Sequence, residues 1–520
     1  MQGRKELKPK MMYQVHIDDL VPKENYYRRL DEVLNLNFLY KETEQYYGSE
    51  GQDSIDPVVF FKICLVGYLN NINSDRRLIE YCSNCLDVRL FIRYDIDEPL
   101  PWHSTISRTR QLYGEEVFLS LFKKVLSLCV QKGMVRGKRQ AIDSAFIKAN
   151  ASMDSLIEKE VVEDAEYYCN ELNEGSEFKV SKSKKAQVDY HHEWKKEGFK
   201  DKLGHNSQQE YTDENGNIKR SRYLSNHTHY SSTDTDARIA VKPGKARQLV
   251  YFGQLAVDDS NHVITGAMAD HADQRDSQCL PAILSQTIEN LQENEITVEQ
   301  IAADTGYSSG EALKFCEENN IDAYIPNFGK YIPSREGFEY DKANDRYLCT
   351  RGNKAILPFK KLRVSHGEYN MKRYASTCKD CRGCPLRSEC IGKSDVKSIS
   401  DTIDKPLFDK MHYKLQSAYA KRIKKKRSST VEPVLGTLIN FLNMKRVNTR
   451  GIRQANKHVL MAALAYNLKK YLNFKDRKPV VNIQVMSWKA TDQSKINFFR
   501  FITSLLTPSN SEVEILSMNN

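Results

Sequence analysis

Apolar residues recur at helical spacing through residues 1–135. A broad apolar face runs from Pro57 to Leu69, behind a proline that suits the first turn of a helix. Ser74 is placed to cap a second helix, and Ser104 a third. A longer helix is expected over Val117–Cys129, where apolar side chains again return at helical spacing. The pattern predicts a helical N-terminal domain.

From residue 139 the period changes to that of a strand. Residues 139–149 alternate between two faces, and Asp143 lies on one of them. Apolar runs at 248–257 and 262–268 flank a polar turn, so we expect the two strands of a hairpin there.

Helices and strands then alternate. A helix is expected over Ser277–Gln292, followed by a strand over 300–304. Ser308 with Glu311 matches a capping box for the next helix, and a short strand follows over 321–325. The full order is strand, hairpin, helix, strand, helix, strand. It matches a ribonuclease-H-like core, an α/β fold whose mixed sheet has antiparallel strands first and parallel strands after.

Two stretches interrupt this core. One is rich in Lys, Glu, His and Ser and poor in Leu, Ile and Val, and its first part, Ser155–Glu174, has a helical pattern. The other has strand-like pieces and clustered cysteines. The predicted organisation is a helical N-terminal domain (1–135), an α/β core (136–473) with insertions at about 155–245 and 327–400, and a C-terminal tail (474–520).

Composition excludes several classes of protein. With 40% hydrophobic and 28% charged residues, the 520-residue chain has the profile of a soluble protein with roughly three domains. The longest apolar stretch, Val459–Tyr466, is far below the ~20 residues that span a bilayer, and the N-terminus carries no secretory pattern. Scattered cysteines indicate a reducing cytosol. The net charge of +10 is moderate, so its distribution matters more than its total.

Three acidic residues stand where metal-bound carboxylates would. Asp143 lies within the first core strand, Asp304 at the carboxyl end of the fourth, and Glu432 at the expected start of a helix. Carboxylates suit Mg²⁺, and converging carboxylates can hold the metal pair used in phosphoryl transfer. Each also has an ordinary alternative: a strand surface for Asp143, turn chemistry for Asp304, and a capping box with Ser429 for Glu432.

Cysteines cluster in the second insertion, where their spacing suits a tetrahedral Zn²⁺ site. An iron–sulfur cluster and a loop of free thiols are the alternatives. The four residues are Cys378, Cys381, Cys384 and Cys390.

Basic residues gather in two places that could contact DNA phosphates. Four arginines lie in the helical domain, where they could equally serve solubility. A dense run directly precedes Glu432, which favours phosphate contact near that residue. The residues are Arg76, Arg77, Arg108 and Arg110 in the domain, and Lys421, Arg422, Lys424, Lys425, Lys426 and Arg427 in the run.

The segments around the three acids resemble the acidic motifs of DDE transposases from bacterial insertion sequences. They read Ala-Ile-Asp143-Ser-Ala-Phe-Ile-Lys, Ala-Ala-Asp304-Thr-Gly-Tyr and Val-Glu432-Pro-Val-Leu-Gly-Thr. Segments at 74–78 and 100–107 are similar to the helical domain that precedes the catalytic core in that family. The resemblance extends, with gaps, from about residue 15 to 472.

The resemblance implies metal-dependent DNA cleavage and strand transfer. Asp143, Asp304 and Glu432 would hold two Mg²⁺ or Mn²⁺ ions at each active site. The partners would be double-stranded DNA, as terminal inverted repeats and as target, and a second copy of the chain in a synaptic homodimer. It also implies bacterial cytoplasm with nucleoid association, and no membrane partner.

The sequence departs from the family at basic positions near Glu432. Ser428 and Ile439 stand where relatives often carry Arg and Lys. We therefore expect the basic partner of Glu432 among Arg427, Lys445 and Arg446. Two alternative functions stay open: a catalytically decayed DNA-binding protein, and another ribonuclease-H-like nuclease.

Overall fold

The structure is a computed structural model, and it describes residues 15–48, 54–158, 210–212, 218–220, 225–226, 229–241, 246–329, 331–365 and 369–474. The chain divides into two compact units, Met1–Asn473 and Phe474–Asn520. All of the second unit beyond Phe474 lies outside the described residues.

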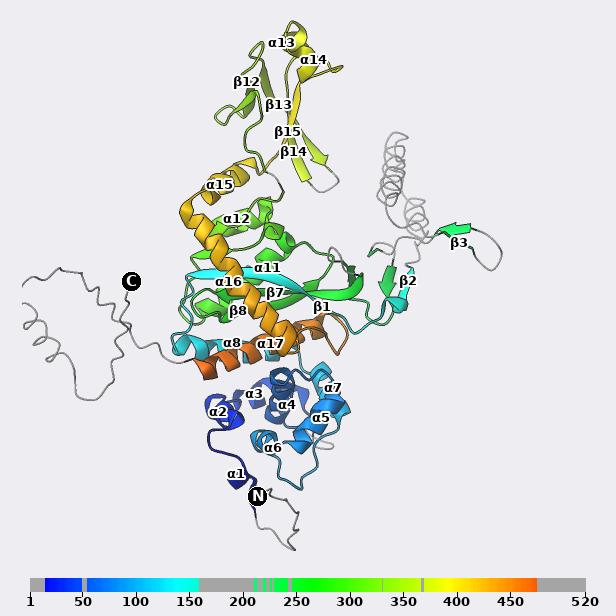
Figure 1. The fold of residues 1–520 in the computed structure, drawn as a ribbon, viewed down its shortest axis with the longest axis vertical. Coiled ribbons are helices and arrows are strands. Elements are labelled where there is room, and N and C mark those ends of the chain that lie inside the picture. The colour runs from blue at the N-terminus through cyan, green and yellow to red at the C-terminus, as the bar shows by residue number, and fades with distance from the viewer. Residues whose placement is uncertain are drawn as a thin grey trace, which may run out of the picture. The chain divides into compact units, whose positions relative to one another are not determined.

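Helices form the N-terminal part of the first unit, as the sequence predicts (Figure 1). They are α1 (Ile17–Leu20), α2 (Tyr26–Val33), α3 (Phe38–Thr43), the short 3₁₀ helix η1 (Glu44–Tyr46), α4 (Pro57–Leu69), α5 (Asp75–Asn84), α6 (Leu86–Ile92), α7 (His103–Leu112) and α8 (Glu115–Gln131).

Of the two serine caps predicted in this domain, one forms and one does not. The side chain of Ser74 accepts a hydrogen bond from the backbone N–H of Arg77 and caps α5, as expected. The predicted cap at Ser104 is wrong, since the N-cap of α7 is Trp102, two residues earlier, and it makes no side-chain cap. Ser104 instead lies in the first turn, where its Oγ accepts from Nη2 of Arg108 (3.3 Å).

A six-stranded mixed sheet forms the core. Its strand order is β10-β9-β1-β7-β6, and β8 also pairs with β7. β1 is antiparallel to β7, and β7 to β8, whereas β9 is parallel to both β1 and β10. The predicted order of antiparallel and then parallel strands is confirmed. The strands are β1 (Arg139–Lys148), β6 (Arg238–Ala240), β7 (Gln248–Asp258), β8 (Ile264–His271), β9 (Gln300–Ala302) and β10 (Asp322–Tyr324).

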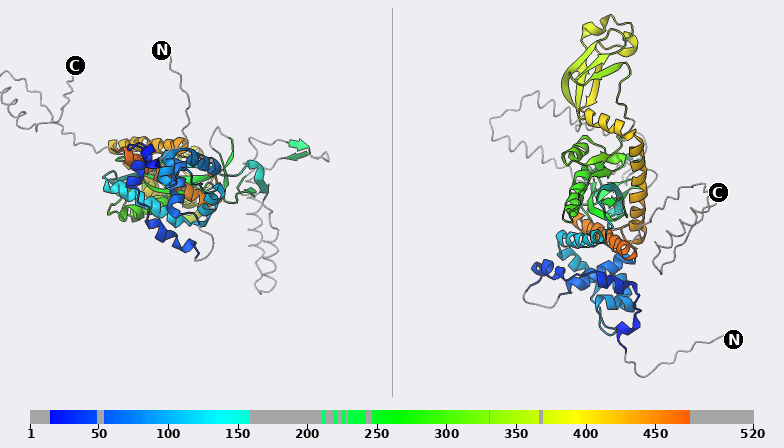
Figure 2. Two further views of the ribbon diagram at one scale, coloured as in Figure 1. Left: turned by 90° about the horizontal axis from the view of Figure 1, so that it is seen from below. Right: turned by 90° about the vertical axis from the view of Figure 1, so that its left-hand side faces the viewer.

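Helices from distant parts of the sequence pack against this sheet (Figures 1 and 2). α11 (Asp276–Gln292) and α12 (Gly310–Glu318) share a buried apolar cluster with β1, β7 and β9. α16 (Ala418–Phe441) contacts β1, β7, β9 and β10. α17 (Ile452–Asn473) packs against β8 and also against α4 and α8. The N-terminal helices therefore rest on the core through α17.

The cap of α12 lies one position from where the sequence places it. Ser309, and not Ser308, is the N-cap, and its side chain accepts from the N–H of Ala312. A 3₁₀ turn, η3 (Thr305–Tyr307), intervenes after β9 and shifts the start of α12 by one residue.

The first insertion is described only in part. The 3₁₀ turn η2 (Met153–Ser155) leads directly into a strand, β2 (Leu156–Glu158), so the expected helix does not begin at Ser155. β2 pairs with β5 (His229–Ser231), and β3 (Glu210–Thr212) pairs with β4 (Ile218–Arg220). The rest of the expected helix, to Glu174, lies outside the described residues.

The second insertion forms an antiparallel sheet of its own, in the order β11-β12-β13-β14-β15. Tyr347, Leu357, Tyr374 and Ile399 make its small buried core. Its elements are β11 (Phe338–Asp341), β12 (Arg346–Cys349), β13 (Ile356–Ser365), β14 (Tyr369–Ala375), α13 (Cys378–Arg382), α14 (Arg387–Cys390) and β15 (Ser398–Thr402), and α15 (Lys405–Leu415) leads back to the core.

Candidate active site

Two parallel strands bring Asp143 and Asp304 to one edge of the sheet. In the register of β1 with β9, Ala141 lies opposite Ala302. Asp143 and Asp304 each follow two residues later, so both stand just beyond the last pair between β1 and β9, while Asp143 stays paired with Leu255 of β7. Asp304 is exposed, and its carboxylate accepts a hydrogen bond from the N–H of Thr305 (2.7 Å). This edge is where ligands bind in open α/β sheets.

Asp143 is held in a setting that disfavours its own charge. Its side chain is only 20% exposed, and burial raises its pKa above the usual value. The N–H of Ser144 and the guanidinium of Arg427 act in the opposite direction, whereas the negative charge of Asp304 raises the pKa further. Asp143 is therefore a carboxylate that additional positive charge would stabilise.

Glu432 lies in the middle of a helix, and the prediction that it opens one is wrong. α16 begins at Ala418, where Ser417 caps it by accepting from the N–H of Ala420 (3.1 Å). Ser429 donates its hydroxyl to the carbonyl of Lys426 and makes no capping box. The Glu432 side chain is 60% exposed, so its carboxylate is available to a ligand.

Arg427 links two of the three acidic motifs. Its Nη1 donates to Oδ2 of Asp143 (2.8 Å), and its Nη2 lies 3.8 Å from Oε1 of Glu432. Glu432 follows Arg427 by five positions, so the two side chains come from neighbouring turns of α16 near Asp143, in the middle of β1. Of the three expected basic partners of Glu432, Arg427 is the one that the structure places beside it.

Asp276 is a fourth acidic residue at this edge, in addition to the three that the sequence predicts. It begins α11, and its Oδ1 accepts from the hydroxyl of Ser144 (2.7 Å). Burial raises its pKa, and the charge of Asp304 adds to that effect. Gly306 leaves room for it, since a Cβ there would lie 2.7 Å from Oδ2 of Asp276. An acid in the first turn of a helix is common, so its sequence position alone gives no functional signal.

The donor chemistry of these acids fits a hard divalent cation such as Mg²⁺. Asp143, Asp304 and Glu432 offer carboxylate oxygens from three elements that meet at one edge. Among the residues that the structure describes, however, no three His, Cys, Asp or Glu side chains converge closely enough to hold a metal ion. The side chain of Arg427 supplies the positive charge between two of them.

Comparison with known families decides what kind of protein carries this site. The family described as "Transposase domain (DUF772)" matches residues 15–112, and the family described as "Transposase DDE domain" matches residues 348–472. The chain is a DDE transposase of the insertion-sequence type. Glu432 and Arg427 lie within the second match, and Asp143 and Asp304 lie between the two. No curated protein matches the chain significantly.

Membership of this family settles the general activity of the transposase. DDE transposases act on DNA and carry out metal-dependent cleavage and strand transfer, and their catalytic domain has a ribonuclease-H-like fold. The mixed sheet described above is of that kind. Among the described residues, no helix is long and apolar enough to cross a membrane.

Most of the basic run on α16 faces solvent. Its five exposed cations precede Glu432 on the same helix. One of them, Lys426, pairs with Asp259 (2.7 Å). Arg427 is the exception, because it is 10% exposed and turned toward Asp143. The exposed residues of the run are Lys421, Arg422, Lys424, Lys425 and Lys426.

The four arginines of the helical domain fall into two classes. Arg76, Arg77 and Arg108 are exposed on α5 and α7. Arg110 is buried, and its guanidinium donates to both carboxylate oxygens of Asp75 (2.9 and 2.7 Å). This buried pair corrects the expected DNA contact, because Arg110 joins α7 to α5 inside the protein.

The four clustered cysteines of the transposase do not form a metal-binding group in the structure. Cys378 is exposed, whereas Cys381, Cys384 and Cys390 are half-buried and line one small cavity. A fifth cysteine, Cys349 of β12, lines the same cavity. Its position could not be read from the local spacing, since the fold of the second sheet brings it there.

Proposed function

We propose that Asp143, Asp304 and Glu432 are the divalent-metal ligands with which this transposase cuts and joins DNA at the ends of its element. The observation that carries the proposal is the meeting of three distant motifs. β1 and β9 align Asp143 with Asp304, and Arg427 joins Asp143 to Glu432. The chemistry that two bound divalent ions supply at such a site is activation of the attacking oxygen and stabilisation of the leaving oxygen.

The protein's own residues prepare this site in two ways. Arg427 offsets the mutual repulsion of Asp143 and Glu432, which would otherwise oppose their approach. Asp276 accepts a hydrogen bond from Ser144, the residue after Asp143, and so helps to hold the middle of β1 in place. Positioning of this kind matters because catalytic groups lose much of their effect when they are displaced by an ångström.

We further propose that exposed cations bind the phosphates of the element ends. Arg76, Arg77 and Arg108 would bind from the helical domain, with a second contribution from the exposed run on α16. Lys445 and Arg446, which follow α16, are also exposed. Synapsis of two ends would need a second copy of the chain, so we propose a homodimer.

Cleavage of DNA that carries the flanking inverted repeats tests the proposal. With Mg²⁺, wild-type protein is expected to cut at the element end, whereas Asp143→Asn, Asp304→Asn and Glu432→Gln should bind the DNA but fail to cut. Glu318→Gln is the matched control, because Glu318 is exposed at the end of α12. A Glu432→Gln variant that still cuts would remove that residue from the site. Wild type that binds but never cuts would favour a decayed element, and cutting without joining would favour a nuclease.

A structural Zn²⁺ at the Cys-rich segment is a separate proposal. What supports it is the close spacing of the cysteines and the cavity that Cys381, Cys384 and Cys390 share. Elemental analysis of the full-length protein should find one zinc for each chain, lost in Cys384→Ser and kept in Cys85→Ser. Iron in place of zinc would indicate an iron–sulfur cluster. The absence of any metal from wild type would indicate that the cysteines are free thiols.

A further inference from the structure

A small cavity lies between β12 and the segment of α13 and α14, at one end of the second sheet (Figure 1). Its volume of about 20 Å³ is room for one water molecule or one metal ion. Cysteines line it from four places along the chain: a strand, two short helices and the loop that joins the helices. The four residues are Cys349 in β12, Cys381 in α13, Cys384 in the loop and Cys390 in α14.

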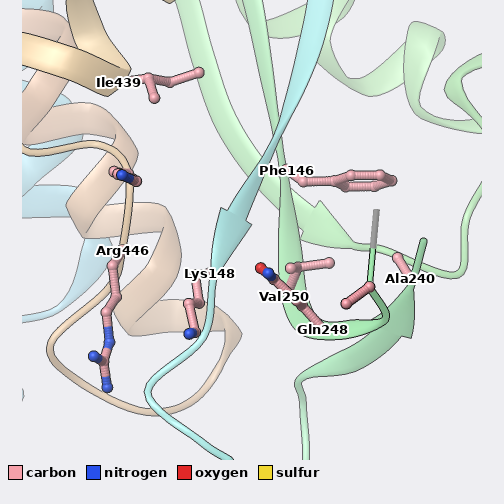
Figure 3. Close-up of a pocket in the computed structure, with 9 residues that line it drawn as sticks. Phe146, Lys148, Ala240, Gln248, Val250, Ile439 and Arg446 are labelled. Atoms are coloured by element: carbon pink, nitrogen blue, oxygen red, sulfur yellow. The ribbon is translucent and has the colours of Figure 1, made fainter. Parts of the chain in front are cut away.

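This set differs from the four cysteines that are close together in the sequence. Cys378 begins α13 and is exposed, and it does not line the cavity. Cys349, from a separate strand, lines it instead. The larger groove at the end of β1, drawn in Figure 3, has no such set, since none of its described lining residues carries a thiol, an imidazole or a carboxylate. Of these two hollows, the small cavity is therefore the one with metal-binding side chains.

The turn between β12 and β13 brings Cys349 to α13 and to the loop that follows it. Asn353 in this turn donates from Nδ2 to the carbonyl of Asp380 in α13 (3.3 Å). Gly352 has a positive φ of 61°, and a Cβ at its position would lie 2.5 Å from Sγ of Cys384. A side chain there would displace that sulfur, so glycine permits the close approach. The turn that follows Cys349 is thus in direct contact with Cys384.

Two of the sulfur atoms contact other polar groups in the structure. The thiol of Cys349 donates to the carbonyl of Arg351, and Sγ of Cys381 lies 3.3 Å from Oγ of the buried Ser376. In this arrangement the described sulfurs are not close enough together to hold a metal ion. A metal ion binds thiolates, so on binding the S–H proton of Cys349 would pass to solvent and its hydrogen bond would be lost. Rotation about the Cα–Cβ bond would then turn Sγ toward the cavity.

Cations beside the cavity suit a site of negative charge. Four thiolates around one divalent ion leave a net negative charge. Arg387 and Lys397 both line the cavity, and Nζ of Lys397 donates to the carbonyl of Cys390 (2.9 Å). Arg387 also pairs with the exposed carboxylate of Asp395 (3.5 Å), and the acidic lining residue Asp380 uses its carboxylate to cap α13. The two cations can therefore offset part of the charge of a thiolate site.

We propose that the four cysteines of the cavity bind one Zn²⁺ as thiolates and that Cys378 is not a ligand. The proposal rests on the structural zinc proposed for the Cys-rich segment, and it replaces one of that site's four ligands. Soft thiolates in a tetrahedral set select zinc. The bound ion ties β12 to α13 and α14 and so stabilises the second sheet, whose buried apolar core is small. The ligands are Cys349, Cys381, Cys384 and Cys390.

The zinc affinities of two serine variants test this ligand set. Full-length protein is loaded with one Zn²⁺ for each chain, and the ion is withdrawn by titration with a chelator. Cys349→Ser should weaken zinc binding by at least about tenfold, because it removes a ligand. Cys378→Ser is the matched control at an exposed cysteine of the same segment, and it should keep the wild-type affinity.

Alkylation of the wild-type protein tests the same point without a variant that has to fold. In zinc-loaded protein, iodoacetamide should modify Cys378 and leave Cys349 unmodified, because a metal-bound thiolate is shielded from the reagent. Mass spectrometry of the peptides identifies the modified residue. Removal of zinc by the chelator should then make Cys349 reactive.

The other outcomes separate this ligand set from the zinc site itself. Wild-type affinity in Cys349→Ser, or rapid alkylation of Cys349 in zinc-loaded protein, would overturn the ligand set. If Cys378→Ser weakens binding instead, the site uses the four cysteines that are close in sequence, and the structural zinc stands. If wild type binds no zinc, both proposals fail.

Discussion

Arg427 lies between two acidic residues of the site, and its positive charge offsets the repulsion between them. It is 10% exposed and lies 2.8 Å from Asp143 and 3.8 Å from Glu432. Removing its charge would leave Asp143, a carboxylate whose pKa burial already raises, without its closest cation.

We expect Arg427→Gln to lower the single-turnover rate of DNA cleavage by about tenfold or more, which corresponds to ~1.4 kcal/mol in the barrier. Arg427→Lys should keep part of the rate because it keeps the charge. Lys424→Gln, exposed on the same helix, is the control for lost DNA affinity. If Arg427→Gln cuts as fast as wild type, the residue is only a passive neighbour of the acids.

Asp276 allows function to be separated from stability. Burial raises its pKa, so the folded protein favours the neutral carboxyl more than the unfolded chain does. At pH 7 the charged form therefore costs folding free energy, and a neutral isostere does not carry this cost. Asp276→Asn should leave the urea midpoint unchanged or slightly higher while cleavage falls. A clear drop in the midpoint would show that the Ser144 contact serves the fold.

At the residue scale, the sequence identifies Asp143, Asp304 and Glu432 but not their surroundings. Motif spacing marks an acid at a strand end, whereas it cannot show that Arg427 reaches Asp143 across 284 positions. For the same reason, the sequence predicts Arg110 as a surface cation, whereas the structure shows it buried and paired with Asp75. Long-range ion pairs carry no local signal.

At the element scale, α16 shows how strong local signals can mislead. Ser429, Glu432 and Pro433 together have the pattern of a helix start. The helix in fact begins at Ala418, capped by Ser417, and Pro433 lies inside it. Proline lacks an N–H, so it leaves a carbonyl one turn earlier without its helical partner. The rest of the helix packs against four strands of the sheet and can tolerate this loss.

A pair of serine substitutions distinguishes the two possible helix starts. Ser417→Ala removes the observed cap and should cost about 1 kcal/mol of unfolding free energy. Ser429→Ala should cost much less, because its hydroxyl only bonds back to Lys426 within the helix. Urea unfolding of both variants measures this. The opposite ranking would restore the helix start near Glu432.

At the scale of the whole molecule, the alternation of strands and helices is enough to predict that the central sheet has antiparallel strands first and parallel strands after. It does not predict that α17, late in the chain, joins the N-terminal helices to that sheet. α17 is buried on most of its faces, so its pattern shows burial without showing the partner.

One buried histidine makes this junction sensitive to pH. Nδ1 of His458 on α17 hydrogen-bonds to the hydroxyl of Tyr68 on α4 (2.7 Å), and burial, with Arg110 nearby, lowers the pKa of His458 to about 4. As the pH falls, His458 becomes protonated near pH 6.5 in the unfolded chain but only near pH 4 in the folded protein. Stability should therefore fall as pH drops through this window, by up to roughly 3 kcal/mol from this residue.

Urea unfolding at pH 7 and pH 5 checks this sign. Wild type should lose more stability between the two pH values than His458→Gln, which cannot titrate. Equal losses in the two proteins would mean that other groups cause the pH dependence.

The central claim is that Asp143, Asp304 and Glu432 form one metal site, and direct titration with Mn²⁺ tests it without depending on turnover. Free Mn²⁺ is followed by electron paramagnetic resonance in the presence of element-end DNA. Wild type should bind two ions for each chain, and Asp143→Asn, Asp304→Asn and Glu432→Gln should each weaken binding by about tenfold or more, whereas Glu318→Gln should not. If one of the three acidic variants binds Mn²⁺ with wild-type affinity and stoichiometry, that residue is not a metal ligand. If all three variants do so, the claim of a metal site is contradicted.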